Sequence, residues 1–221
     1  MDRTAHDVLR TTTAELAPGA AENGLVPLLA SGAADRGAVA ALALEQQHVI
    51  ASDRSAFTHL AGRSAARGDD ACAVFFAALA RGEDTAAERL EALITGCGLD
   101  RADAAAYEPT AGCQAYPSYV ARLALTAAPA EAALALIVNF AAWGGYCATI
   151  AEGLRTHYGF DDAACGFFDF FAEPAPVLEA QGTAAVQAGL DGGLDLTAAR
   201  RHGRLLQSYE LMFWNTLAGQ A

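Results

Sequence analysis

One acidic residue near the end of the chain lies among apolar residues at helical spacing. In the run LLQSYELMFWNTL, residues 205–217, Glu210 belongs to a face whose members follow one another at intervals of four, three, one and three. The apolar members of this face are Leu206, Phe213, Trp214 and Leu217. An ionised carboxylate is unfavourable in apolar surroundings unless it is paired, hydrogen-bonded or protonated through a raised pKa. Glu210 therefore either reaches solvent or lines a site.

A second group of polar and aromatic side chains occurs in the run NFAAWGGYC. Asn139, Trp143 and Tyr146 follow at intervals of four and three, so an amide, an indole and a phenol share a helical face, with the thiol of Cys147 one position further. Two interpretations remain open. The group is a packed aromatic core with an inert thiol, or it forms the wall of a cavity beside two glycines.

Two further stretches could carry chemistry. In EQQHVIASD, Glu45 and His48 are three residues apart, and such a pair is half of the ligand set of a carboxylate-bridged di-iron bundle. The other half is missing, because no remaining His has a carboxylate at helical spacing on an inward face, so we expect no metal. In FFDFFAE, Asp169 stands among four Phe residues and is expected on a narrow solvent face.

Composition limits the class of protein. The chain of 221 residues is 53% hydrophobic and 18% charged, which suits one domain over residues 1–221 with a large core. Its net charge of −12 opposes binding to nucleic acid or to anionic membranes. The five cysteines form no CxxC pair, which indicates free thiols in a reducing cytoplasm. We find neither a secretory leader nor a membrane span in the sequence.

The secondary structure is expected to be entirely helical, because alanine dominates and β-branched residues are sparse. Asp69 or Asp70 can cap the third long helix, Pro117 can open the fourth, and Thr197 can cap the last. The helices are expected at about residues 4–16, 35–67, 71–98, from 117, from 129, 161–172, 173–190 and 196–217. The prediction is one bundle of about seven or eight helices.

Four segments together resemble the TenA/thiaminase II family. SYELMFWNTL is similar to the final-helix signature of that family, in which a catalytic glutamate precedes Phe and Trp by three and four residues. AYPSYVARLAL resembles its Tyr-x-x-Tyr segment, GFFDFFA its Trp-Ile-x-x-Tyr-Ala segment, and EQQHVI its Gln-Asp-x-x-Tyr stretch. The order and spacing match over roughly residues 20 to 219.

This resemblance implies a heme-oxygenase-like all-α fold, assembled as a homo-oligomer (dimer or tetramer), with a small pocket in each protomer and no cofactor. It implies hydrolysis of thiamin or of aminopyrimidines derived from it, in thiamin metabolism. The residues whose roles it implies are Glu210 as catalytic acid/base, Phe213 against the ring, Tyr116 as a pocket tyrosine, and Glu45 and His48 in place of an aspartate and a tyrosine. A shift of one residue would place Gln46 and Val49 there instead.

The chain departs from the family at its nucleophile. The family has a Pro-Cys-x-Trp-x-Tyr stretch, whereas FAAWGGYCATIAEGL carries Trp143 where the cysteine stands. Cys147 follows one turn later and is a candidate for a displaced nucleophile, with Asn139 and Tyr146 as neighbouring substrate contacts. Phe171 replaces a pocket tyrosine. Loss of the thiol removes the covalent route.

The function expected from the sequence is therefore binding, and cysteine-independent hydrolysis, of a small aminopyrimidine-like molecule. The alternatives are a non-catalytic binding or regulatory module and a metal-dependent oxidase of the same superfold.

Overall fold

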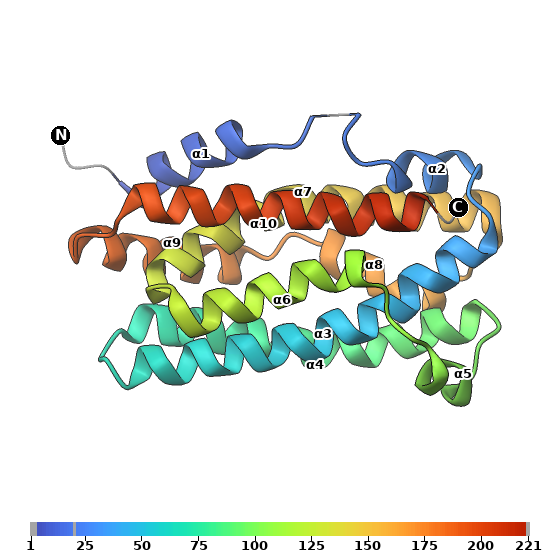
Figure 1. Cartoon of the computed structure of the whole chain (residues 1–221), viewed down its shortest axis with the longest axis horizontal. Coiled ribbons are helices and arrows are strands. Elements are labelled where there is room, and N and C mark those ends of the chain that lie inside the picture. The colour runs from blue at the N-terminus through green and yellow to red at the C-terminus, as the bar shows by residue number, and fades with distance from the viewer. Residues whose placement is uncertain (1–3, 20, 220–221) are drawn as a thin grey trace.

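The chain folds as a bundle of helices, as the composition predicts (Figure 1). The structure is a computed structural model that describes residues 4–19 and 21–219, and no β-strand occurs in these ranges. The elements are α1 (Ala5–Leu16), α2 (Leu25–Ser31), α3 (Arg36–Ala65), α4 (Asp70–Gly96), α5 (Arg101–Ala106), α6 (Ala111–Thr126), α7 (Pro129–Gly153), the π-helical segment η1 (Leu154–Tyr158), α8 (Asp162–Ala172), α9 (Pro176–Asp191) and α10 (Leu196–Ala218). The predicted all-α fold class is confirmed.

Two long helices, α3 and α4, form an antiparallel hairpin along one side of the bundle (Figure 1). They are joined by a short turn in which Gly68 has a φ of 73°, a conformation that glycine adopts without steric cost. The side chain of Asp69 accepts a hydrogen bond from the backbone N–H of Cys72 at 3.1 Å and so caps α4. The hairpin provides one wall of the bundle.

The opposite side consists of α7 and α10, with α6 packed between α10 and α3. Helix α7 is long and strongly apolar, and it also contacts α1, α2, α8 and α9. By length and composition alone the Pro129–Tyr158 segment is long and apolar enough to cross a membrane. Here, however, Leu134, Leu136 and Ile150 are completely buried against the neighbouring helices, as expected for the central helix of a bundle.

One expected helix start and one expected helix cap are wrong. Helix α6 begins at Ala111, so Pro117 lies inside the helix and is buried rather than in its first turn. Residues 111–116, which precede the expected start, are therefore helical. Helix α10 is capped by Asp195, whose carboxylate accepts from the backbone N–H of Thr197 and Ala198, so Thr197 is not the cap.

Helix α7 approaches α2 closely at one glycine. A Cβ atom at Gly153 would lie 2.6 Å from the carbonyl oxygen of Leu29 and 3.1 Å from the Cα of Ala30. These are backbone atoms and cannot move aside without shifting α2. We expect Gly153→Ala to lower the free energy of unfolding by about 1–3 kcal/mol, measured by urea denaturation.

Gly62 supplies the matched control, because a Cβ at this position in α3 would meet no atom within 4 Å. Gly62→Ala is expected to stabilise the protein by up to about 1 kcal/mol through its higher helix propensity. Equal effects of the two substitutions would contradict the proposed close approach.

Candidate functional site

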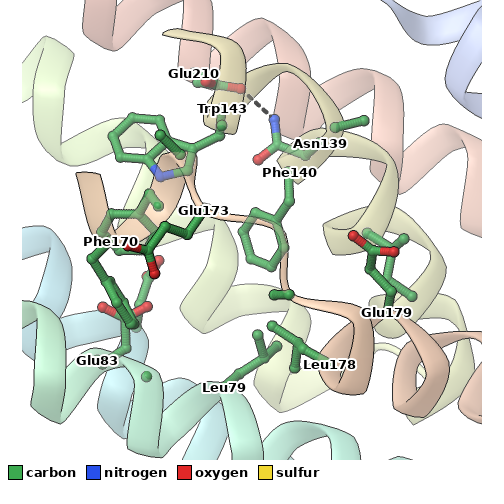
Figure 2. Close-up of a pocket in the computed structure, with 18 of the residues that line it drawn as sticks. Leu79, Glu83, Asn139, Phe140, Trp143, Phe170, Glu173, Leu178, Glu179 and Glu210 are labelled. Carbon is green, nitrogen blue, oxygen red and sulfur yellow. Dashed lines mark hydrogen bonds between the residues drawn. The ribbon is translucent and has the colours of Figure 1, made fainter. Parts of the chain in front are cut away.

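A cavity of about 640 Å³ lies between the α3–α4 hairpin and helices α6, α7 and α10, and the α8–α9 segment completes its wall. Most of its surface is apolar and aromatic. Figure 2 shows Glu210 and Asn139 on one side of this cavity, Glu83 and Leu79 on the opposite side, and Phe140 between them. A cavity of this size suits a small organic molecule, for which pockets measure about 300–1,000 Å³.

Glu210 of α10 is 5% exposed and lines this cavity. Three neutral donors hold its carboxylate. Trp214 Nε1 donates to Oε1 at 3.1 Å, while Asn139 Nδ2 and Gln207 Nε2 donate to Oε2. Of the two alternatives for Glu210, the structure therefore shows the second, a carboxyl that lines a cavity, and side chains from two helices set its orientation.

Burial raises the pKa of Glu210 to about 7, although the hydrogen bonds from Trp214, Asn139 and Gln207 oppose the shift. A carboxylic acid with a pKa near neutrality is able both to donate and to accept a proton at that pH. The cavity wall adds no compensating cation, because the described residues that line it include no Lys, Arg or His. The geometry thus equips Glu210 for proton transfer.

The aromatic wall contains most of the ring positions expected from the sequence. Tyr116 from α6 donates from its hydroxyl to Asn139 Oδ1 at 3.4 Å. The indole of Trp143 packs edge-on to Phe171, with ring centroids 5.5 Å apart, and lies 5.6 Å from the ring of Trp214. The predicted residues that line the cavity are Tyr116, Asn139, Trp143, Phe171, Phe213 and Glu210.

Glu45 does not line the cavity, although it is completely buried. Its Oε1 accepts from the hydroxyl of Tyr107 at 2.9 Å and from the backbone N–H of Thr110 at 2.6 Å, and its Oε2 accepts from Gln114 Nε2 at 2.7 Å. This carboxylate therefore ties α3 to the segment that enters α6.

His48 lies on the same side of α3 as Glu45. The centroid of its ring is 6.3 Å from the ring centroid of Tyr107. The pair that suggested half of a metal site is thus directed away from the cavity. The neighbouring positions Gln46 and Val49 line the cavity instead, as the alternative register with a shift of one residue predicts.

Cys147 and Tyr146 also lie outside the cavity lining. The thiol of Cys147 is completely buried, and burial followed by the negative charge of Glu210 raises its pKa well above the ordinary value. Tyr146 is half-buried and packs edge-on to Trp214, with centroids 5.7 Å apart. Because a thiolate is required for attack, the structure gives no support to Cys147 as a displaced nucleophile.

We expect Cys147 to react with a thiol reagent at least about 100-fold more slowly in the folded protein than in the unfolded chain, since its exposure requires an opening of several kcal/mol. Mass spectrometry after timed labelling would measure this rate. The half-buried Cys97 is the internal control and should react first. Rapid labelling of Cys147 in the folded protein would contradict this placement.

Asp169 lies neither fully in solvent nor in the cavity. Its Oδ1 accepts from Arg155 Nη1 at 3.0 Å and its Oδ2 from Arg155 Nη2 at 2.6 Å, and its side chain is about one third exposed. This bidentate pair ties η1 to α8 and so holds the helix that supplies Phe171.

A pair of carboxylates on the hairpin side of the cavity was missed in the sequence. Asp53 of α3 and Glu83 of α4 both line the cavity. A usable signal exists for Asp53, because it lies seven residues after Gln46, on the same helical face. Its polar neighbours in the stretch ASDRS are typical of a solvent-exposed face, so the sequence did not single it out.

No protein-family model matches the chain, and no curated protein sequence matches it significantly. Solved structures, in contrast, do match the chain in fold. A TenA homologue from P. horikoshii OT3 superposes with a TM-score of 0.72 at 18% identity, covering 99% of this chain and 100% of that one. A TenA homologue from Pseudomonas syringae pv. tomato str. DC3000 gives 0.72 at 12% identity, covering 98% and 91%.

A domain of unknown function with a heme oxygenase-like fold, from Shewanella denitrificans OS217, gives a TM-score of 0.69 at 12% identity and covers 96% of this chain and 89% of its own. The chain therefore has the heme-oxygenase-like fold found in TenA homologues. At these identities the likeness establishes the fold, and the resemblance expected from the four sequence segments is confirmed at that level.

Proposed function

We propose that the cavity binds a small, flat, nitrogen-containing molecule of the aminopyrimidine class, related to thiamin, and that Glu210 is its anchoring and acid/base group. The observation that carries this proposal is a buried carboxyl with a pKa of about 7 at the wall of an aromatic cavity. A neutral carboxyl donates a hydrogen bond to a ring nitrogen, and the carboxylate accepts one from an amino group. Phe213 and Trp143 offer faces and edges against which a flat ring packs.

We further propose that the protein hydrolyses a C–N bond of this ligand with water as the nucleophile. In an aminomethyl-aminopyrimidine, the carbon–nitrogen bond of the side arm breaks, the oxygen of water bonds to the same carbon, and the nitrogen leaves as ammonia. Glu210 transfers protons to and from the pyrimidine ring, and no electron donor or acceptor is needed. Cys147 takes no part, because its buried thiol does not line the cavity.

A binding module without turnover would use the same cavity. The metal-dependent oxidase alternative is not favoured by the geometry, because Glu45 is engaged by Tyr107, Thr110 and Gln114. Within residues 4–19 and 21–219, no group of three or more His, Cys, Asp or Glu side chains is arranged to hold a metal ion.

The decisive experiment is incubation of the full chain with aminomethyl-aminopyrimidine, with calorimetry for binding and quantification of ammonia and of the hydroxymethyl product. Stoichiometric release of both products supports the hydrolase. Saturable binding without ammonia release supports the binding module. Absence of binding overturns the proposal for this ligand class.

A further inference from the structure

We infer that Asp53 and Glu83 form a second ligand subsite, which binds a protonated amine on the side of the cavity opposite Glu210. The inference rests on the proposed function for the ring class of the ligand, but the subsite itself is argued from the hairpin and the cavity alone. It assigns to the ligand a cationic amino group in addition to the part that meets Glu210.

The register of the α3–α4 hairpin brings the two acids together. An ion pair joins Arg54 of α3 to Asp84 of α4, and both side chains are about half exposed. Asp53 and Glu83 immediately precede these two residues and are rotated by about 100° around their helices, which turns them from the surface into the cavity. Asp84 therefore has a basic partner at the surface. Asp53 and Glu83 have no basic partner among the described residues that line the cavity.

Asp53 has an unsatisfied carboxylate oxygen. It is 4% exposed, and its Oδ1 has no hydrogen-bond partner in the described part of the chain. Buried polar atoms almost always have a partner, so an orphan at the wall of a cavity indicates that something else supplies the donor. A protonated amine carries three N–H donors and is suited to two carboxylates.

The electrostatic surroundings favour a cation. Burial raises the pKa of both acids, and the charge of Asp53 raises that of Glu83 further. These shifts favour the protonated forms of both acids in the free protein, and a bound ammonium ion would favour the ionised carboxylates. Glu173 and Glu179, which are exposed, also line the cavity, and no basic side chain is among the described lining residues. The negative field of the cavity therefore attracts a positively charged ligand.

An organic ammonium ion fits this subsite better than a metal ion. Two carboxylates supply fewer oxygen ligands than the six to eight that Ca²⁺ takes. The cavity wall here also contains the apolar Ile50, Phe75 and Leu79, which pack against an organic group rather than against the hydration shell of a metal ion. Figure 2 shows Phe170 on the same side as Glu83, and Phe140 between this side and Glu210. An amine attached to a flat ring would thus place its charge between the acids and its ring against these aromatic side chains.

The test compares ligands that differ only in the amine. One pair is aminomethyl-aminopyrimidine and hydroxymethyl-aminopyrimidine, and the second pair is benzylamine and benzyl alcohol. Dissociation constants are measured at pH 7 by calorimetry for the wild type, Asp53→Asn, Glu83→Gln and the control Glu88→Gln. Glu88 is an exposed acid on α4, so this control removes the same charge outside the cavity.

We expect the wild type and Glu88→Gln to bind the amine at least about tenfold more tightly than the alcohol, as for a charge-assisted contact of 1.4 kcal/mol or more. Each cavity variant should lose most of this preference and keep its affinity for the alcohol within about threefold. Circular dichroism would verify that the variants fold. Preference that persists in both variants, absence of preference in the wild type, or no binding by either pair would overturn the inference.

The same measurements distinguish failure of the proposed function from failure of the ammonium subsite. If neither pyrimidine binds while benzylamine is still preferred through Asp53 and Glu83, the ammonium subsite stands and the pyrimidine assignment falls. If both pyrimidines bind equally well in every variant, the proposed function stands and the subsite falls.

Discussion

Replacing Glu210 with Gln is expected to reduce the rate of ammonia release from aminomethyl-aminopyrimidine by about 100- to 10,000-fold, the usual contribution of a general acid/base. An amide keeps the size of the side chain but neither donates nor accepts a transferable proton. The hydrogen bond from Trp214 Nε1 to the side-chain oxygen can be retained, so the loss should fall mainly on kcat. Steady-state kinetics with an ammonia assay would measure it.

Cys147→Ala is the matched control for this prediction. The thiol is buried and does not line the cavity, so its removal should leave kcat within about threefold, since no bond to the substrate is lost. Hydrolysis that survives in Glu210→Gln but disappears in Cys147→Ala would reverse the assignment and restore the cysteine as the nucleophile.

The stability of the protein is expected to fall with rising pH because of Glu210, and the substitution by Gln should remove this loss. Burial raises the pKa of Glu210 from 4.5 to about 7 in the folded state. The folded protein therefore holds this proton more tightly than the unfolded chain does. The stabilisation is complete below pH 4.5 and is lost as the pH rises through 7.

A shift of this size corresponds to about 3 kcal/mol. The difference in unfolding free energy between Glu210→Gln and the wild type should therefore become more favourable to the variant by about 3 kcal/mol from pH 4 to pH 8. Urea denaturation of both proteins across this range would measure it. Because Asp53 and Glu83 titrate in both proteins, the difference isolates Glu210. If the unfolding free energies of the two proteins changed with pH in the same way, the pKa of Glu210 would not be raised in the folded state.

The inward orientation of Glu210 could be predicted because α10 has one solvent face and one buried face. On such a helix, a residue that shares the spacing of Leu206 and Phe213 must share their burial. Helix α3 offered no such contrast. It is packed against α4 and α6, so that both Glu45 and Gln46 are buried. Periodicity therefore could not show which of them faces the cavity.

Short-range signals also failed where tertiary packing decided the outcome. Pro117 indicated a helix start, yet α6 begins six residues earlier and continues through it. Cys147 lies one turn from Trp143, and the rotation between them places the indole in the cavity wall and the thiol in solid packing. Such a difference depends on where the neighbouring helices lie, which residue spacing does not contain.

The amino-acid sequence by itself determined that the chain is helical, that its core is large and that one acid belongs to an apolar stripe, because these properties follow from local propensity and from the 3.6-residue period. The tertiary structure alone decided that a hollow exists beside that acid and that Asp53 and Glu83 meet on its other side. These two acids are separated by 30 positions in the sequence, and only the packing of α3 against α4 brings them together.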